Sequence, residues 1–125
     1  MSRRTVLVIE DDPKLRFILE EQLIADFDVI TAESAEAALT ELQTFTPDLV
    51  LLNILLPGMD GIELCRSIRA HERLASVPVI FLTGRIDAKS RERCLAVGAN
   101  DYITKPWQGP DLIQRISEVI GLARP

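Results

Sequence analysis

The sequence predicts a doubly wound α/β domain, with a five-stranded parallel sheet covered by helices on both faces in three α/β/α layers. The first observation is a set of short apolar runs that are continuous rather than alternating, as expected of strands buried on both faces. The second is that a longer stretch of helical period follows each run, which favours parallel strands joined by right-handed crossovers. The clearest runs are Val6–Ile9, Leu49–Leu52 and Val79–Leu82.

Two weaker runs, Asp28–Thr31 and Tyr102–Thr104, are expected to form edge or near-edge strands and complete the five βα units. The helices are predicted from apolar residues that recur at helical spacing and would face the sheet. The segment Asp87–Val97 is more polar, so we expect a lightly packed, exposed helix there. The apolar face predicted for the first helix consists of Leu15, Ile18, Leu19 and Leu23.

The ends of the predicted helices carry typical start and stop residues. Pro13 stands where the first helix begins, and Ser34 can cap the second. Gly98 follows the fourth helix, where a glycine often ends a helix in a left-handed conformation. Asp12 is expected to help cap the first helix rather than to take part in a site.

Composition and charge restrict the class of protein. The 125 residues fit a single domain, residues 1–125, with 47% hydrophobic and 26% charged residues, as in an ordinary globular protein. The net charge of -5 argues against a nucleic-acid-binding surface, because phosphate contacts need a basic patch. No apolar run approaches the roughly 18 residues that a membrane span needs. Cys65 and Cys94 lack metal-binding or redox spacing, which predicts reduced thiols and a cytoplasmic location.

Polar residues follow the predicted strands at the edge where doubly wound sheets bind ligands. Adjacent carboxylates favour a hard cation such as Mg²⁺, while an ammonium and a hydroxyl bind the oxygens of an anion. Together they describe a phosphoryl site. An aspartate at position 53 could attack phosphorus, but an asparagine amide cannot. The residues concerned are Glu10-Asp11-Asp12, Asn53, Thr83-Gly84 and Lys105-Pro106.

The same residues, in this order, make the chain resemble the receiver domain of bacterial response regulators in two-component signalling. The resemblance extends over essentially the whole chain and includes the stretch Asn53–Gly61. It implies a flavodoxin-like fold and a phosphorelay switch that is a signalling module rather than an enzyme. It further implies that Mg²⁺ is held by Glu10 and Asp11, with the side chain at position 53 and the backbone carbonyl of Leu55 as further ligands.

The resemblance also implies roles around the phosphoryl group. Thr83 and Lys105 would contact its oxygens, and Gly84 would leave room for it. Tyr102, three residues before the lysine, matches an aromatic switch position that follows the movement of Thr83, although a plain half-buried aromatic is an equal alternative. Trp107 stands where the family often has phenylalanine. Arg85, two residues past Thr83, is expected to be an ordinary exposed arginine near the entrance.

Asn53 departs from the family pattern, because receivers carry the phospho-accepting aspartate there. Three explanations remain open. The aspartate was replaced deliberately, which the intact remainder of the site favours, or the chain is a natural phosphate-independent pseudo-receiver that acts as a protein-interaction module. The third is another module of the same fold class, such as a small-molecule-binding or hydrolase domain. No glycine-rich phosphate loop follows the first strand and no Ser or Cys nucleophile follows any strand, which weighs against the third.

Partners are expected only from the resemblance. A histidine kinase or phosphotransfer protein would donate the phosphoryl group. A downstream protein or fused output domain would bind the face built from Asp87–Val97, Asp101–Thr104 and the last helix. Pairing of two copies through this face stays open, whereas neither nucleic acid nor membrane is expected as a direct partner.

Overall fold

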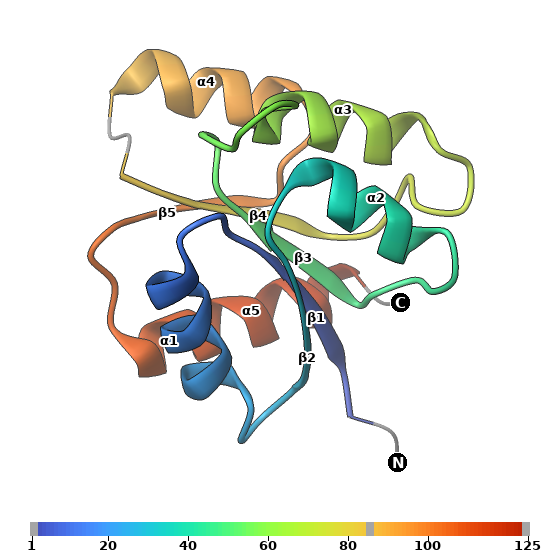
Figure 1. Ribbon diagram of the computed structural model, residues 1–125. Coiled ribbons are helices and arrows are strands. Elements are labelled where there is room, and N and C mark those ends of the chain that lie inside the picture. The colour runs from blue at the N-terminus through green and yellow to red at the C-terminus, as the bar shows by residue number, and fades with distance from the viewer. Residues whose placement is uncertain (1–2, 85–86, 124–125) are drawn as a thin grey trace.

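Strands and helices alternate along the chain in the computed structural model, which describes residues 3–84 and 87–123 (Figure 1). The alternation matches the βα units predicted from the sequence. The elements are β1 (Thr5–Ile9), α1 (Pro13–Leu23), β2 (Asp28–Ala32), α2 (Ala35–Leu42), β3 (Leu49–Leu52), α3 (Gly61–Ala70), β4 (Val79–Thr83), α4 (Ala88–Ala96), β5 (Asp101–Thr104) and α5 (Gly109–Ala123).

The sheet has the strand order β2-β1-β3-β4-β5, and every neighbouring pair is parallel. The three continuous apolar runs form the interior strands β1, β3 and β4, as predicted. The two weaker runs form the edges β2 and β5, which are only partly buried. Helices α2, α3 and α4 cover one face of the sheet, and α1 and α5 cover the other (Figure 1). The doubly wound, three-layer fold is therefore confirmed.

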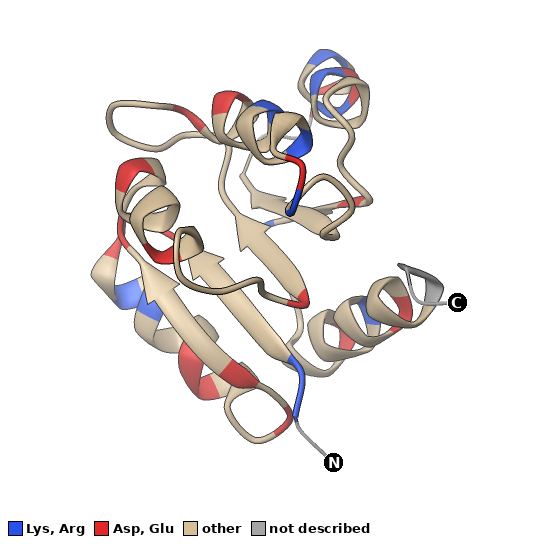
Figure 2. Ribbon diagram, turned by 90° about the vertical axis from the view of Figure 1, so that its right-hand side faces the viewer, with Lys and Arg blue, Asp and Glu red and all other residues tan. Residues whose placement is uncertain are grey.

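Alternate side chains of the buried strands supply two separate cores, one on each face of the sheet. Leu7 and Leu52 pack beneath α2 and α3, whereas Val8 and Leu51 pack beneath α1 and α5. Charged residues lie mainly on helices, in loops and at strand ends, and the middle of the sheet carries none (Figure 2). Polar chemistry is thereby confined to the ends of the strands.

The caps predicted from the sequence are confirmed. The side chain of Asp12 accepts a hydrogen bond from the Lys14 amide at 2.9 Å, and Pro13 follows as the first helical residue. Ser34 Oγ accepts from the Ala37 amide at 3.0 Å. Gly98 follows α4 with a φ of 96°, a left-handed conformation that glycine adopts without steric cost.

One prediction for α1 was wrong. Leu19 and Leu23 are buried, but the side chain of Ile18 is 43% exposed. Ile18 lies about 100° around the helix from Leu19, and α1 contacts the sheet through a narrower face than its apolar residues suggest. Phe17 beside it is 61% exposed, so α1 presents apolar side chains to solvent. Within residues 3–84 and 87–123, no helix combines the length and apolar character needed to cross a membrane.

The first residue of α3 packs directly against the loop that follows β3. The Gly61 amide donates to the Ile54 carbonyl at 2.8 Å. A Cβ at Gly61 would lie 2.1 Å from the carbonyl oxygen of Asn53, far inside contact distance. Only glycine permits this approach, and the approach fixes the backbone at the end of β3.

Gly61→Ala would force a methyl group against backbone, and we expect the free energy of unfolding to fall by about 1–3 kcal/mol. The control is Gly121→Ala in α5, where an added Cβ meets no atom within 4 Å. There the higher helix propensity of alanine is expected to raise stability by up to about 1 kcal/mol. Urea unfolding followed by circular dichroism measures both variants. Equal effects of the two substitutions would contradict the close packing at Gly61.

Candidate functional site

The polar residues predicted to form a site converge at the carboxyl edge of the sheet. Strand β1 lies between β2 and β3, so the chain reverses its winding there, which is where such sheets bind ligands. The backbone amide of Asn53 donates to the Ile9 carbonyl at 3.4 Å, and the backbone amide of Lys105 donates to the Thr83 carbonyl at 2.9 Å. Backbone pairing therefore brings residues from four strand ends to one place.

Glu10 is the centre of this cluster. Its side chain is only 3% exposed, and its Oε1 lies 3.1 Å from the Nζ of Lys105. The side-chain amide nitrogen of Asn53 (Nδ2) donates to the same oxygen at 3.5 Å, and the backbone amide of Asp12 donates to Oε2 at 3.1 Å. A buried carboxylate is costly unless it is paired and hydrogen-bonded, and these donors supply both conditions.

Asp11, the second residue of the predicted acidic pair, is exposed. The turn that carries the pair is held by Arg16, whose guanidinium donates to the backbone oxygens of Glu10 at 2.8 Å and of Asp11 at 3.4 Å. Arg16 was not among the predicted site residues. A single arginine in the first turn of a helix has no sequence signal that distinguishes it from a surface residue.

The loop after β3 carries Leu55, whose backbone amide donates to Asn53 Oδ1 at 3.4 Å. A second support comes from α2, because Glu36 Oε2 accepts from the Met59 amide at 3.1 Å. The carboxylate also lies close to Gly58, which has a φ of 72°. The hydrogen bond from Met59 lowers the pKa of Glu36 below its ordinary value. Glu36 is a second residue that sequence reasoning missed, because its partner is a backbone amide 23 residues away.

Strand β4 ends at Thr83 at the same edge, and Gly84 follows it. The Thr83 side chain is 1% exposed, whereas a Cβ at Gly84 would meet no atom within 4 Å, so the position beside Thr83 is open. Tyr102 is half-buried on the neighbouring strand β5 and packs against the core beneath α2 and α3. The Lys105–Pro106 peptide that follows is cis. Arg85 lies outside the described residues.

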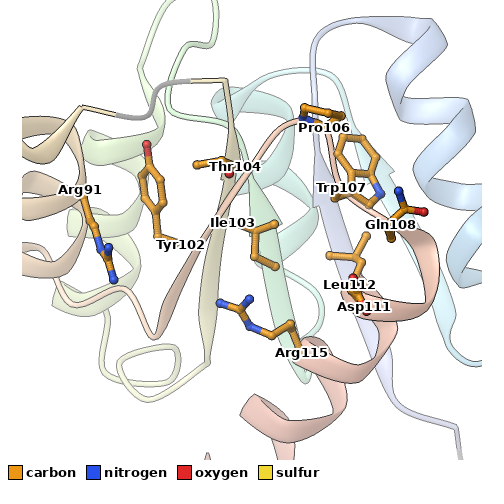
Figure 3. Close-up of a pocket in the computed structure, with 10 residues that line it drawn as sticks. All are labelled: Arg91, Tyr102, Ile103, Thr104, Pro106, Trp107, Gln108, Asp111, Leu112 and Arg115. Atoms are coloured by element: carbon orange, nitrogen blue, oxygen red, sulfur yellow. The ribbon is translucent and has the colours of Figure 1, made fainter.

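A groove of about 400 Å³ lies beside this cluster, along β5 and α5 (Figure 3). Arg91, Tyr102, Asp111 and Arg115 are among the residues that line it, but Glu10, Asn53 and Lys105 are not. Arg115 binds Asp101 through two hydrogen bonds of 2.6 and 2.8 Å, and this contact raises the pKa of Arg115. The groove thus belongs to the face of β5 and α5 rather than to the acidic cluster.

Trp107 links this groove to α1. Its indole nitrogen donates to the side-chain oxygen of Gln22 at 2.7 Å, which ties the loop after Lys105 to the first helix. The tryptophan therefore has a defined partner on α1.

A family model for the response regulator receiver domain matches residues 6–117. The chain belongs to this family. The phosphate regulon transcriptional regulatory protein PhoB of Rhizobium meliloti is 39% identical over 121 residues, which cover 96% of this chain and 53% of that protein. The DNA-binding response regulator MtrA of Mycolicibacterium smegmatis is 38% identical over 115 residues, covering 91% and 49%. This receiver domain spans about half the length of these curated relatives.

A solved structure adds a metal to the comparison. The receiver domain of the sensor histidine kinase PA1611 from Pseudomonas aeruginosa is 30% identical, with a TM-score of 0.88 and coverage of 96% of this chain and 99% of that one. Its structure has a magnesium ion coordinated in the active site cleft. Receiver domains therefore bind Mg²⁺ in their active site.

The donor set of this receiver domain fits such an ion in part. Glu10 and Asp11 contribute two carboxylates, and Mg²⁺ is commonly bound through one or two carboxylates while it keeps several waters. Asn53 contributes only a neutral amide oxygen. Among the described residues, no group of three or more His, Cys, Asp and Glu side chains is arranged to hold a metal. The residues thus fit a weakly held, largely hydrated ion.

The Glu36 carboxylate supports the loop after β3 while it is ionised, which gives a pH-dependent prediction. Because its pKa is lowered from 4.5 in the folded protein, its contribution to stability is present above that value and is lost as the pH falls through the folded pKa. We therefore expect Glu36→Gln to lower the Tm near neutral pH, and we expect this effect to shrink as the pH falls below 4.5 and through the folded pKa.

Thermal unfolding of both proteins across this pH range measures the effect. The control is Glu41→Gln, also in α2, because the Glu41 carboxylate makes no hydrogen bond among the described residues. Its Tm difference from the parent is expected to change less with pH. A Glu36→Gln difference that stayed constant from acid to neutral pH would contradict the proposed support.

Proposed function

We propose that this receiver domain is a phosphorelay switch module of two-component signalling, in a form that cannot accept a phosphoryl group at position 53. The observation that carries the proposal is the cluster at the carboxyl edge, where Lys105 and Asn53 both reach Glu10, at 3.1 and 3.5 Å. An ammonium, two acids and a threonine at one strand edge fit phosphoryl transfer.

The chemistry depends on the atom at position 53. A carboxylate there would attack phosphorus, displace the donor's leaving group and form an acyl phosphate. The amide of Asn53 has nearly the same shape but no charge and negligible nucleophilicity. Lys105 would then balance the charge of the phosphoryl oxygens and Thr83 would donate a hydrogen bond to them. The buried position of Thr83 beside the open position at Gly84 supports this role.

Glu10, Asp11 and the backbone carbonyl of Leu55 would hold Mg²⁺, with Asn53 as a neutral fourth contact and water in the remaining positions. When bound, the ion would neutralise charge on the transferred group. Loss of one carboxylate charge at position 53 weakens this binding. Arg16 supports the proposal, since its hydrogen bonds to the backbone oxygens of Glu10 and Asp11 fix the turn that carries the acidic pair.

The partner surface would be the face of α4, β5 and α5. Helix α4 is lightly packed, with only Ser90 and Cys94 buried, and Leu95 is 50% exposed. In a phosphorylated form, movement of Thr83 would let Tyr102 turn inward and shift this face toward its active arrangement. With Asn53 at this position, the face of α4, β5 and α5 stays in its inactive arrangement. A downstream protein, a fused output domain or a second copy of the chain would bind there.

The phosphoryl donor would be a histidine kinase or a phosphotransfer protein. Two relatives named above are transcriptional or DNA-binding regulators about twice as long, so DNA binding would belong to a region outside this acidic domain. Cys65 and Cys94 are free and buried, which supports a reducing, cytoplasmic setting.

A second function is a pseudo-receiver, an interaction module that works without phosphate. The observation in its favour is that the Asn53 side-chain amide and the Lys105 ammonium both donate to Glu10 Oε1, so these three side chains form an internally paired polar cluster. The two functions differ in one result, which is whether an aspartate at position 53 restores phosphorylation.

Asn53→Asp is expected to gain one phosphoryl group when incubated with Mg²⁺ and acetyl phosphate, because the restored carboxylate meets an otherwise intact site. Intact-mass spectrometry detects the adduct. The parent chain and Asn100→Asp serve as controls. Asn100 Oδ1 accepts from the Val79 amide at 2.9 Å, a role that a carboxylate oxygen retains. No adduct on Asn53→Asp would favour the pseudo-receiver.

Phosphorylation of the Asn53→Asp chain is also expected to change amide hydrogen exchange in α4 and β5. The reason is that Thr83 and Tyr102 connect position 53 to this face. Exchange followed by mass spectrometry, with the parent chain treated in the same way, measures the change. Changes confined to α1 and α2 would contradict the proposed output face.

A further inference from the structure

Trp107 follows the strand-end lysine by two residues and has its partner on another element. Its indole nitrogen donates to Gln22 Oε1 at 2.7 Å, and Gln22 belongs to the last turn of α1. Both side chains are half-buried, and Trp107 packs against the core beneath α1 and α5. Figure 3 shows Trp107 at one end of the groove, on the side of α1. A phenylalanine could fill this space but could not donate the hydrogen bond.

Gln22 reaches the same loop at a second point. An indole nitrogen only donates, so the side-chain oxygen of Gln22 must face Trp107 and its Nε2 end is directed elsewhere. A Cβ at Gly109 would lie 3.4 Å from this Nε2 and 3.6 Å from Cδ. Gly109 is the first residue of α5. One side chain of α1 therefore lies against both ends of the segment that leads from the strand-end lysine into α5.

The other end of α1 holds the acidic turn. Arg16 donates to the backbone oxygens of Glu10 and Asp11. Gln22 lies six residues further along, or about 9 Å along the helix axis. Helix α1 is thus attached near its first turn to the end of β1 and in its last turn to the loop after β5. These two attachments set the separation between the acidic turn and that loop.

The backbone of Lys105 is held on both sides. Before it, strand pairing acts through the hydrogen bond from the Lys105 backbone amide to the Thr83 carbonyl at 2.9 Å. After it, Trp107 is the anchored side chain of the loop, because Pro106 and Gln108 on either side are exposed. Misplacement of a reacting group by about 1 Å can slow a reaction by as much as about 10²-fold. An anchor two residues from the lysine therefore bears on the rate of any chemistry that uses its ammonium.

We propose that Trp107 and Gln22 form a positioning pair for the phosphoryl site. Their hydrogen bond holds the loop after Lys105 against the same helix that holds the acidic turn. Neither side chain takes part in bond formation, and the pair acts through Lys105, whose ammonium must meet the phosphoryl oxygens as the new bond forms. The proposal rests on the proposed function, because the reaction that it serves is the one proposed there.

The test uses the Asn53→Asp chain with Mg²⁺ and acetyl phosphate. The new carboxylate oxygen bonds to phosphorus as the bond from phosphorus to the acetate oxygen breaks, and acetate leaves. Intact-mass spectrometry over time gives the rate constant of adduct formation. Adding Gln22→Met, which removes the acceptor, is expected to slow the reaction about three- to tenfold. Trp107→Phe removes the donor and is expected to have a similar effect, and the two together are expected to slow it no more than either alone.

Two further variants separate positioning from stability. Gln22→Glu keeps an acceptor for the indole and is expected to restore most of the rate that Gln22→Met loses. Val77→Ala opens a cavity in the core beneath α2 and α3, near the amino end of β4 and away from the site. It is expected to lower the Tm without slowing the reaction of the folded chain. Gln22→Met is expected to show the reverse, a large loss of rate with a smaller loss of Tm.

Fluorescence reads the hydrogen bond itself, because Trp107 is the only tryptophan of the chain. This reading needs no phosphorylation and uses the chain with Asn53 in place. Gln22→Met is expected to increase the quenching of Trp107 by acrylamide, since the indole would lose its partner on α1. Gln22→Glu is expected to leave the quenching close to that of the parent. Equal quenching in all three chains would overturn the pairing.

The outcomes separate this proposal from the one on which it rests. If Asn53→Asp takes up a phosphoryl group at the same rate with and without Gln22→Met, the positioning role is overturned and the proposed function stands. A loss of rate that Gln22→Glu or Val77→Ala shares would mean that packing or stability governs the rate, and would also overturn the proposal. If Asn53→Asp takes up no phosphoryl group, the proposed function is wrong and the positioning role falls with it, whatever the fluorescence shows.

Discussion

The ion pair between the buried Glu10 carboxylate and the part-buried Lys105 ammonium ties the end of the first strand to the end of the last, and the geometry of the site depends on it. Its two members are 95 residues apart in the sequence and 3.1 Å apart in the fold. A carboxylate buried this deeply would destabilise the protein if its partner were removed. The pair therefore constrains both strand ends at the point where chemistry would occur.

Around this pair, the loops are held by contacts between side chains and backbone rather than between side chains. Arg16 fixes the turn after β1, and Glu36 fixes the loop after β3. Gly61 lets α3 start against the Asn53 carbonyl, and Arg69 binds the Gly98 carbonyl at 2.8 and 3.0 Å next to the end of α4. Positions near the site and near the proposed output face are thus set by residues that take no part in the chemistry.

Sequence reasoning succeeded where a local pattern has one dominant structural meaning. Continuous apolar runs gave the interior strands, and cap residues such as Asp12 and Ser34 marked helix starts that the structure reproduces. It failed where burial depends on neighbours far along the chain. Ile18 has the spacing of a core residue but is exposed, because it lies about 100° around α1 from the buried Leu19, and only the packed fold shows how wide a face of α1 the sheet covers. Arg16, Glu36 and Arg69 bind backbone atoms of other residues. Because every residue type has these backbone atoms, the identity of the partner residue gives no signal in the sequence.

The sequence by itself determined the fold, the family and the order of polar residues at the strand ends, because successive βα units make the strands parallel and therefore place the residues that follow them at one edge. It also determined that position 53 carries an amide and no nucleophile. Only the tertiary structure decided how these residues pair. It placed Lys105 on Glu10 and turned the Asn53 amide toward the same carboxylate, since the choice among acids close in space depends on distances of a few ångströms that no sequence pattern encodes.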